Sequence, residues 1–243
     1  MKKLFALLCL VAGFSQSASA ANFTALSGVG QANFRLLSED FGSALSYKPV
    51  TPAEPLGITG FDIGVEATST DISKSGAVLK QATGSAVDVT RLIIPKLHVA
   101  KGLPFGIDVA ASYVSVPSTD IKLVGAELRY AILGGGIALP AIAIRAAMTS
   151  MSGVPELDFN TKSLDISISK GILMFTPYVG AGQVWVTSTP QGTATSLGLV
   201  AESFTQNKVF AGLNINLGLL NFALEGDTTG GTSSASFKMG FRW

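Results

Sequence analysis

The stretch "SFKMGFRW" at residues 236–243 alternates between two kinds of side chain. Phe237, Met239, Phe241 and Trp243 are large and apolar, and the residues between them are small or charged. Successive side chains of a β-strand point to opposite faces, so this pattern predicts a strand with one apolar and one polar face. The same pattern recurs along most of the chain, and its recurrence predicts the fold.

Alternation of this kind is present in ten segments of the sequence. In the first of them Phe61 and Ile63 are apolar, whereas Asp62 and Glu66 occupy the opposite face. The ten segments are 57–70, 88–100, 104–116, 121–132, 140–151, 160–170, 174–187, 205–216, 219–227 and 232–243. Most are long enough to cross a bilayer as tilted strands, which takes about 9–11 residues.

Short glycine-containing connections alternate with long polar ones. "KGLP" at 101–104 and "KGI" at 170–172 are short, whereas 71–87 and 187–204 are long and polar. Short turns at one end and long loops at the other are typical of outer-membrane β-barrels, whose turns face the periplasm. We therefore predict an all-β fold, a single antiparallel up-and-down transmembrane β-barrel of about ten strands over residues 57–243.

Two other folds fit parts of the pattern. A soluble secreted β-sandwich would also alternate, but its polar face needs charges, and here that face is rich in Gly, Ala and Ser. The chain is 47% hydrophobic and only 14% charged, against about 25% charged in a typical soluble domain. The apolar stretch at 131–148 has nearly the length of a transmembrane helix, but consecutive glycines, Pro140 and Arg145 argue against one.

Residues 1–20 have the features of a secretory signal peptide. Lys2 and Lys3 precede an apolar run, and small residues follow it, so we expect cleavage between Ala20 and Ala21. Cys9 is the only cysteine and lies in this segment, so we expect the exported chain to contain no thiol.

Residues 21–56 differ from the rest of the chain. Phe34, Leu37 and Phe41 recur at helical spacing ahead of the proline-rich "KPVTPAEPLG". We predict a short amphipathic helix followed by an extended segment, which could plug the lumen, cap its periplasmic mouth or lie on the membrane. An extra hairpin is the alternative, and a second helix is expected near 76–82.

Several motifs resemble a poorly characterised family of small outer-membrane β-barrel proteins of Gram-negative bacteria. They are "KPVTPAEPLGITGFDIGVE", "KGLPFGIDVAASY", "ISKGI…TPYVGAG", "NINLGLLNFALEGD" and "FKMGFRW", which together span most of residues 48–243. The resemblance implies an outer-membrane barrel. It implies no substrate and no catalytic residue.

A set of charged and polar residues shares the parity of the predicted lumen face. The set consists of Asp62, Glu66, Lys96, His98, Asp108, Glu127, Arg129, Arg145, Asp165 and Glu225. Folding of the hairpins predicts Lys96 opposite Asp108, Asp108 level with Glu127, and Arg129 close to Arg145. Such a mixed-sign cluster is either a structural network that fills a narrow barrel or a polar track that selects solutes.

The sequence carries little sign of catalysis. His98 is the only histidine, and its predicted place near the periplasmic end favours a buried structural residue over a general base. No nucleophile elbow and no zinc-protease motif is present in the sequence. We therefore expect no enzyme activity, no cofactor and no metal site, with a barrel hydrolase or acyltransferase as the least favoured alternative.

The pattern predicts a location and a set of partners. We expect an exported protein in the outer membrane of a Gram-negative bacterium, in contact with lipid or lipopolysaccharide. The terminal series from Phe237 to Trp243 resembles the signal by which the outer-membrane insertion machinery recognises its clients, and periplasmic chaperones are expected partners too. The net charge of +1 gives no reason to expect nucleic acid.

Two functions remain open on the sequence. The first is a small porin-like channel or transport protein with a narrow polar lumen and an unidentified solute. The second is a closed structural or adhesive barrel that conducts nothing. A lipid-modifying barrel enzyme is a third and weaker hypothesis.

Overall fold

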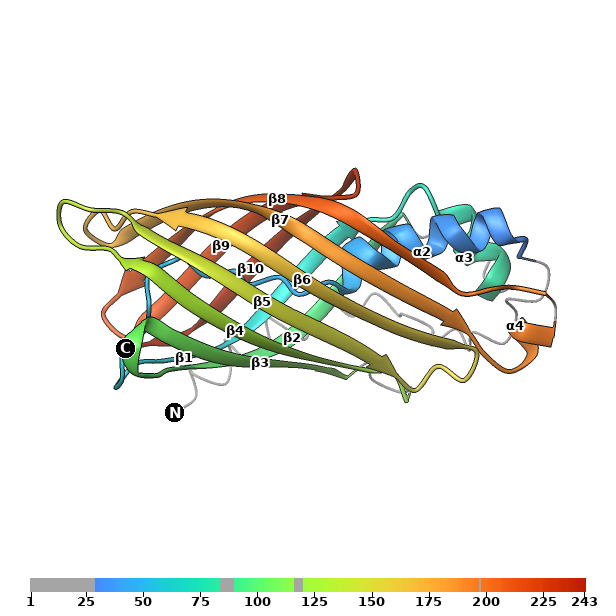
Figure 1. The fold of residues 1–243 in the computed structure, drawn as a ribbon, viewed down its shortest axis with the longest axis horizontal. Helices are drawn as coiled ribbons and strands as arrows, with labels where there is room; N and C mark the ends of the chain where they lie inside the picture. The colour runs from blue at the N-terminus through green and yellow to red at the C-terminus, as the bar shows by residue number, and fades with distance from the viewer. Residues whose placement is uncertain (1–28, 84–89, 116–119, 197) are drawn as a thin grey trace, which may run out of the picture.

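The computed structural model describes residues 29–83, 90–115, 120–196 and 198–243. The chain forms a closed antiparallel barrel in which each strand pairs with the next and β1 pairs with β10 (Figure 1). The predicted signal peptide and its cleavage site at Ala20 and Ala21 lie outside the described residues. In the described ranges, no helix is long and apolar enough to cross a lipid bilayer.

The ten predicted strands are confirmed, with shifts of a few residues at their ends. The strands are β1 (Phe61–Asp71), β2 (Arg91–Gly102), β3 (Ile107–Ser115), β4 (Lys122–Gly134), β5 (Ala141–Ser152), β6 (Leu157–Ser169), β7 (Phe175–Pro190), β8 (Glu202–Leu217), β9 (Leu220–Thr229) and β10 (Thr232–Arg242). The helical elements are α2 (Gln31–Leu45), α3 (Gly76–Thr83), η2 (Pro104–Gly106) and α4 (Thr193–Ser196). The helix expected near 76–82 is α3.

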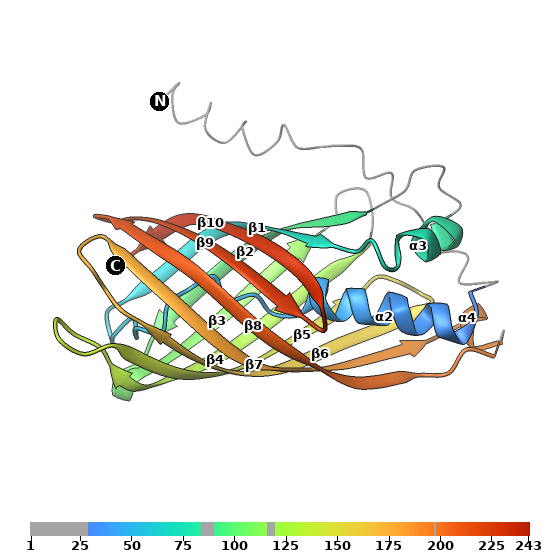
Figure 2. The same ribbon diagram turned by 90° about the horizontal axis from the view of Figure 1, so that it is seen from above.

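The two ends of the barrel differ. One end, which we call the short-turn end, carries the connections β2–β3, β4–β5, β6–β7 and β8–β9 together with the C-terminus (Figure 1). The other, the long-connection end, carries α3, α4 and the outer part of α2 (Figures 1 and 2). In outer-membrane barrels the short turns generally face the periplasm, so we expect the short-turn end to do so here.

The alternation of the sequence follows from the two faces of the wall. Val65, Leu128 and Val209 are exposed on the outside, whereas Glu66 and Glu127 on the opposite parity are buried. An apolar exterior and a polar interior are expected of a barrel whose strands contact lipid on one face only. Trp185 lies in a strand whose two faces are both mildly apolar in the sequence, and its exposed side chain shows that it faces outward.

The N-terminal segment fills the lumen. Helix α2 lies inside the long-connection end, and residues 46–56 run extended through the barrel towards the short-turn end, where β1 begins (Figures 1 and 2). The predicted helix and extended segment are thus present at 31–56, and the alternative hairpin is wrong for these residues. The described part of the segment lies in the lumen, which is one of the three positions considered for it.

Helix α2 is held by an apolar core at the long-connection end. Phe34 and Leu37 are fully buried, and the rings of Phe41 and Phe159 meet edge to face with centroids 6.1 Å apart. The wall contributes inward-facing Val184 to the same cluster. Near the long-connection end the strands therefore point apolar side chains into the lumen. Near the short-turn end they point polar side chains into it.

We expect Phe34→Ala to release α2 from this core. Removing a buried phenylalanine costs about 3–5 kcal/mol, and the wall strands do not depend on this side chain for their pairing. Trypsin cleavage after Arg35 should therefore accelerate, while the folded barrel keeps its heat-modifiable mobility on gels. Leu36→Ala, on the exposed side of the same helix, is the control. Equal protection of the two variants would contradict the packing described here.

Candidate functional site

The polar residues predicted to face the lumen all lie on its inner face. Asp62, Asp108, Arg129 and Arg145 are almost completely buried, and Lys96 is the most exposed member of the set. The remaining members, Glu66, His98, Glu127, Asp165 and Glu225, are buried too. The structure organises them into three groups, and each group also forms hydrogen bonds with the N-terminal segment.

The first group joins β1, β2 and β10. Lys238 Nζ donates to Asp62 Oδ2 at 2.7 Å, and Lys96 Nζ lies 2.6 Å from Glu66 Oε2. His98 Nδ1 lies 3.5 Å from Glu66 Oε1, inside this network. The prediction that Lys96 lies opposite Asp108 is wrong. The reason is that η2 moves the pivot of the hairpin to Phe105, so Gly102 and not Lys96 pairs with Asp108.

The second group joins β3, β4 and β5 to the extended segment. Asp108 pairs in register with Arg129, and not with Glu127 as predicted. Arg129 donates from Nε and Nη2 to Asp108 Oδ2 at 3.0 and 2.5 Å, and from Nη1 to the Pro52 carbonyl at 2.6 Å. The backbone N–H of Leu56 donates to the same carboxylate at 3.1 Å. Both members of this ion pair in the wall therefore bind the segment: Arg129 binds a carbonyl of its backbone, and Asp108 binds an N–H.

Arg145 lies directly opposite Arg129 in the β4–β5 register, as predicted. Its Nε lies 3.2 Å from Glu127 Oε2, and its Nη2 donates to the Thr51 carbonyl at 3.5 Å. Arg129 Nη1 donates to the hydroxyl of the same threonine at 3.1 Å. Two like charges are stable here because each has its own carboxylate and both share acceptors on the extended segment.

The third group joins β6, β8 and β9 to the segment. Lys48 of the segment forms a buried ion pair with Asp227, with Nζ 2.6 Å from Oδ1. Lys208 Nζ donates to the Tyr47 carbonyl at 3.1 Å and to Asp165 Oδ2 at 3.3 Å. The remaining acid, Glu225, accepts a hydrogen bond from the Tyr178 hydroxyl at 3.0 Å.

Sequence reasoning missed three of these residues for different reasons. Lys208 has the inward parity of β8, so the alternation could have identified it. Asp227 is the last residue of the predicted strand 219–227, but β9 extends to Thr229 and buries it. Lys48 lies in a segment without periodicity, and nothing in the sequence indicates where its side chain points.

The three groups share one role, which is to supply hydrogen-bond partners for the backbone of the N-terminal segment. An extended segment inside a barrel has no neighbouring strand, so its backbone N–H and C=O groups need other partners. Cationic side chains of the wall donate to its carbonyls at Tyr47, Lys48, Thr51 and Pro52. The charges of the lumen therefore bind the backbone of the segment as well as one another.

The third hypothesis, an enzyme centred on His98, has little geometric support. His98 is 3% exposed and lies among carboxylates and lysines of the network. Among the described residues, no group of three or more His, Cys, Asp or Glu side chains has a metal-binding arrangement.

Comparisons with known proteins give a likeness of fold only. No protein family and no curated protein matches the sequence. The N-terminal β-barrel domain of Pseudomonas aeruginosa OprF is 15% identical, covers 77% of this chain and 99% of its own, and has a TM-score of 0.36. The translocator domain of the autotransporter NalP from Neisseria meningitidis is 13% identical, with coverages of 93% and 100% and a TM-score of 0.37.

A third solved structure is the KdgM porin in complex with disordered oligogalacturonate. It is 8% identical, covers 75% of this chain and 99% of its own, and has a TM-score of 0.39. The expected likeness to Gram-negative outer-membrane β-barrels is thus found among solved structures. With TM-scores this low, the likeness carries no argument about function.

The buried pair of Lys48 and Asp227 makes the role of the network testable. Removing one partner of a buried ion pair typically costs about 3–5 kcal/mol, because the other charge is left uncompensated. We expect Lys48→Met and Asp227→Leu each to lower the urea midpoint of the folded gel band, and the double variant to unfold closer to the wild type than either. Additive losses would show that the two charges do not depend on each other.

Proposed function

We propose that this protein is an outer-membrane β-barrel held shut by its own N-terminal segment, and that solutes pass only when the segment moves. The proposal joins the two functions that the sequence leaves open. The barrel is closed at rest, and its polar lumen is the path that a displaced segment would uncover.

Burial of the segment is the observation that carries the proposal. Every residue from 40 to 53 is buried, without a break along the axis of the barrel. The stretch begins inside the apolar core around α2 and continues into the charged part of the lumen. A solute would have to displace both packed side chains and hydrogen-bonded backbone to pass.

The composition of the wall supports a latent path. Without the segment, the lumen would be lined by carboxylates, lysines and arginines whose partners had been removed, and water would have to enter to solvate them. A barrel serving only as a scaffold could be filled more simply by its own side chains, as narrow barrels are.

A disulfide between α2 and β7 tests whether the segment moves. The hydroxyls of Ser38 and Ser188 are 2.9 Å apart in the interior, so Ser38→Cys with Ser188→Cys places two thiols in bonding range. We expect the wild type to show no steady conductance in planar bilayers and only rare openings at high voltage. The oxidised double variant should show none, and reduction should restore the openings.

Two further variants separate the outcomes. Deletion of residues 31–50 should give a steady conductance, because it removes the helix and most of the buried part of the segment. Ser38→Cys alone controls for the substitution. Steady conductance of the wild type would refute the closed state, and a silent deletion variant would refute the latent path and leave a structural barrel.

The expected assembly role of the last strand is also a proposal. Trp243 exchanges backbone hydrogen bonds with Phe61, and their rings stack with centroids 5.2 Å apart, at the seam where β10 meets β1. Recognition by the insertion machinery and closure of the seam would both use these terminal aromatic residues.

We expect Phe241→Asp with Trp243→Asp to lower the outer-membrane level of the protein and expose it to periplasmic proteases. Cell fractionation followed by immunoblotting measures this. Ser236→Asp, a charge added to the same strand on its inward face, is the comparison for a mere folding defect. Normal outer-membrane levels of the double variant would contradict the role.

A further inference from the structure

The short-turn end carries apolar side chains at the tips of its turns. Phe105 is 90% exposed, Ile137 103%, Leu173 97% and Leu219 61%. These residues belong to the β2–β3, β4–β5, β6–β7 and β8–β9 connections, so every short connection at this end presents one. We call the four residues the apolar collar. Turn tips that face water are usually Gly, Asn, Asp or Ser.

Two of the collar residues occupy strained backbone. Phe105 has φ 65° and Leu173 has φ 55°, a left-handed conformation that bulky side chains rarely adopt. Glycine or asparagine would fit both positions without strain. The backbone therefore gives no reason for a large apolar residue at either place, and the reason has to lie in what the side chain contacts.

Lysine side chains at this end turn back onto the turns. Lys170 Nζ donates to the carbonyls of Gly136, Ile137 and Leu139 at 2.9, 2.7 and 3.2 Å. Lys101 Nζ donates to the carbonyl of Ile58 and lies 4.3 Å from the ring centre of Phe61. Carbonyls in an apolar medium need such internal partners, because no water is present to supply them.

The opposite end has a different surface. Lys74, Arg91, Asp120 and Lys122 are exposed at or near the long connections. Such a charged end is suited to water or to the polar part of the cell surface. Val200 in the β7–β8 connection is 61% exposed as well, so the collar is distinguished by its presence in all four short connections and not by a complete lack of exposed apolar residues at the other end.

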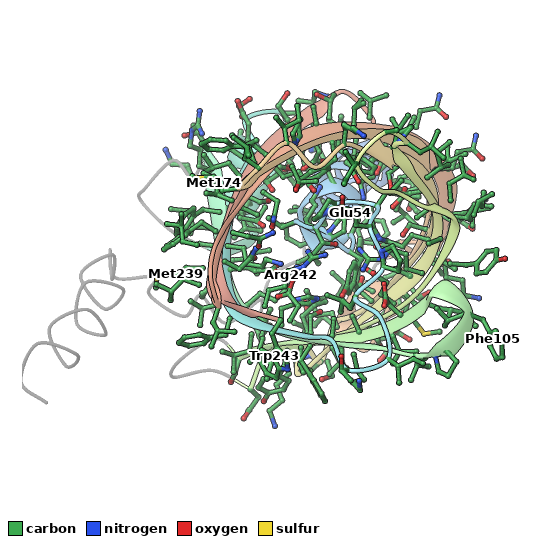
Figure 3. The ribbon with its side chains drawn as sticks, turned by 90° about the vertical axis from the view of Figure 1, so that its left-hand side faces the viewer. Glu54, Phe105, Met174, Met239, Arg242 and Trp243 are labelled. Atoms are coloured by element: carbon green, nitrogen blue, oxygen red, sulfur yellow. The ribbon has the colours of Figure 1, made fainter. Side chains whose placement is uncertain are left out.

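Figure 3 shows the short-turn end along the barrel. Phe105 projects outward from the ribbon wall, away from the lumen, whereas Glu54 lies over the lumen (Figure 3). A partner protein docking along the axis would meet the polar centre first. An apolar medium around the wall would meet the outward-pointing Phe105.

We propose that the collar inserts into the phospholipid leaflet that faces the periplasm, at the boundary between acyl chains and headgroups. The inference rests on the proposed outer-membrane location and is independent of conduction. The turns then anchor the barrel in the leaflet, while Lys101 and Lys170 satisfy the turn carbonyls at that depth.

Site-specific fluorescence in vesicles tests the proposal. An environment-sensitive probe is attached to Ile137→Cys or Leu219→Cys, each in a chain with Cys9→Ser to remove the only native thiol. The variants are placed in phosphatidylethanolamine–phosphatidylglycerol vesicles containing nitroxide at the top or the middle of the acyl chains. Val109→Cys on the outer wall and Ser73→Cys at the long-connection end are the controls. Heat-modifiable mobility identifies the folded fraction of each variant.

We expect the Ile137 and Leu219 probes to emit at shorter wavelength than the Ser73 probe and to be quenched best by the shallow nitroxide. The Val109 probe should be quenched best by the deeper one. Collar probes that emit as the Ser73 probe does, beside a quenched Val109 probe, would overturn the proposal and leave this end free for a periplasmic protein. An unquenched Val109 probe would show that the wall of the folded protein does not enter the bilayer, and would overturn the collar proposal with it.

Discussion

The unpaired backbone of the extended N-terminal segment is the constraint on which the lumen of this protein depends. A chain inside a barrel cannot join the wall by strand pairing, yet its carbonyls are cut off from bulk water. Arg129 donates a hydrogen bond to the carbonyl of Pro52, and Lys208 donates one to the carbonyl of Tyr47. Each added cation then requires an acid beside it, since an isolated buried charge is far more costly than a pair. The dense mixed-sign network follows from that sequence of requirements.

The interior of the barrel differs along the length of a strand. In β7, Val179 and Ala181 face outward near the short-turn end, whereas Val184 and Val186 face inward near the long-connection end. The apolar face therefore changes sides within one strand. It points outward near the short-turn end and inward near the long-connection end, where α2 occupies the lumen. A single strand with two apolar half-faces looks mildly apolar on both, which is why alternation alone could not orient it.

Much of the fold could be predicted from the sequence, and the reasons are physical. A wall with lipid on one side and polar groups on the other imposes a period of two on every strand, so strand positions and inward residues such as Asp62 and Arg145 could be recognised. The register of the β2–β3 hairpin could not, because the three-residue turn η2 changes which residues face each other, whereas the pairing of Arg129 with Arg145 across β4–β5 could. The partners of Lys48 could not be predicted either, because the extended segment has no periodic pattern and contacts with the wall determine where its side chains point.

The path of the segment limits the order in which the molecule can be assembled. Gln31 bonds to Val200 and Glu202 at the long-connection end, yet β1 begins at the other end, so the chain traverses the full lumen before the wall starts. Pairing of β1 with β10 converts an open sheet into a ring around that chain. Drawing a packed helix through the finished ring would need the lumen to empty and refill. A sheet that closes around a segment already in place avoids that step.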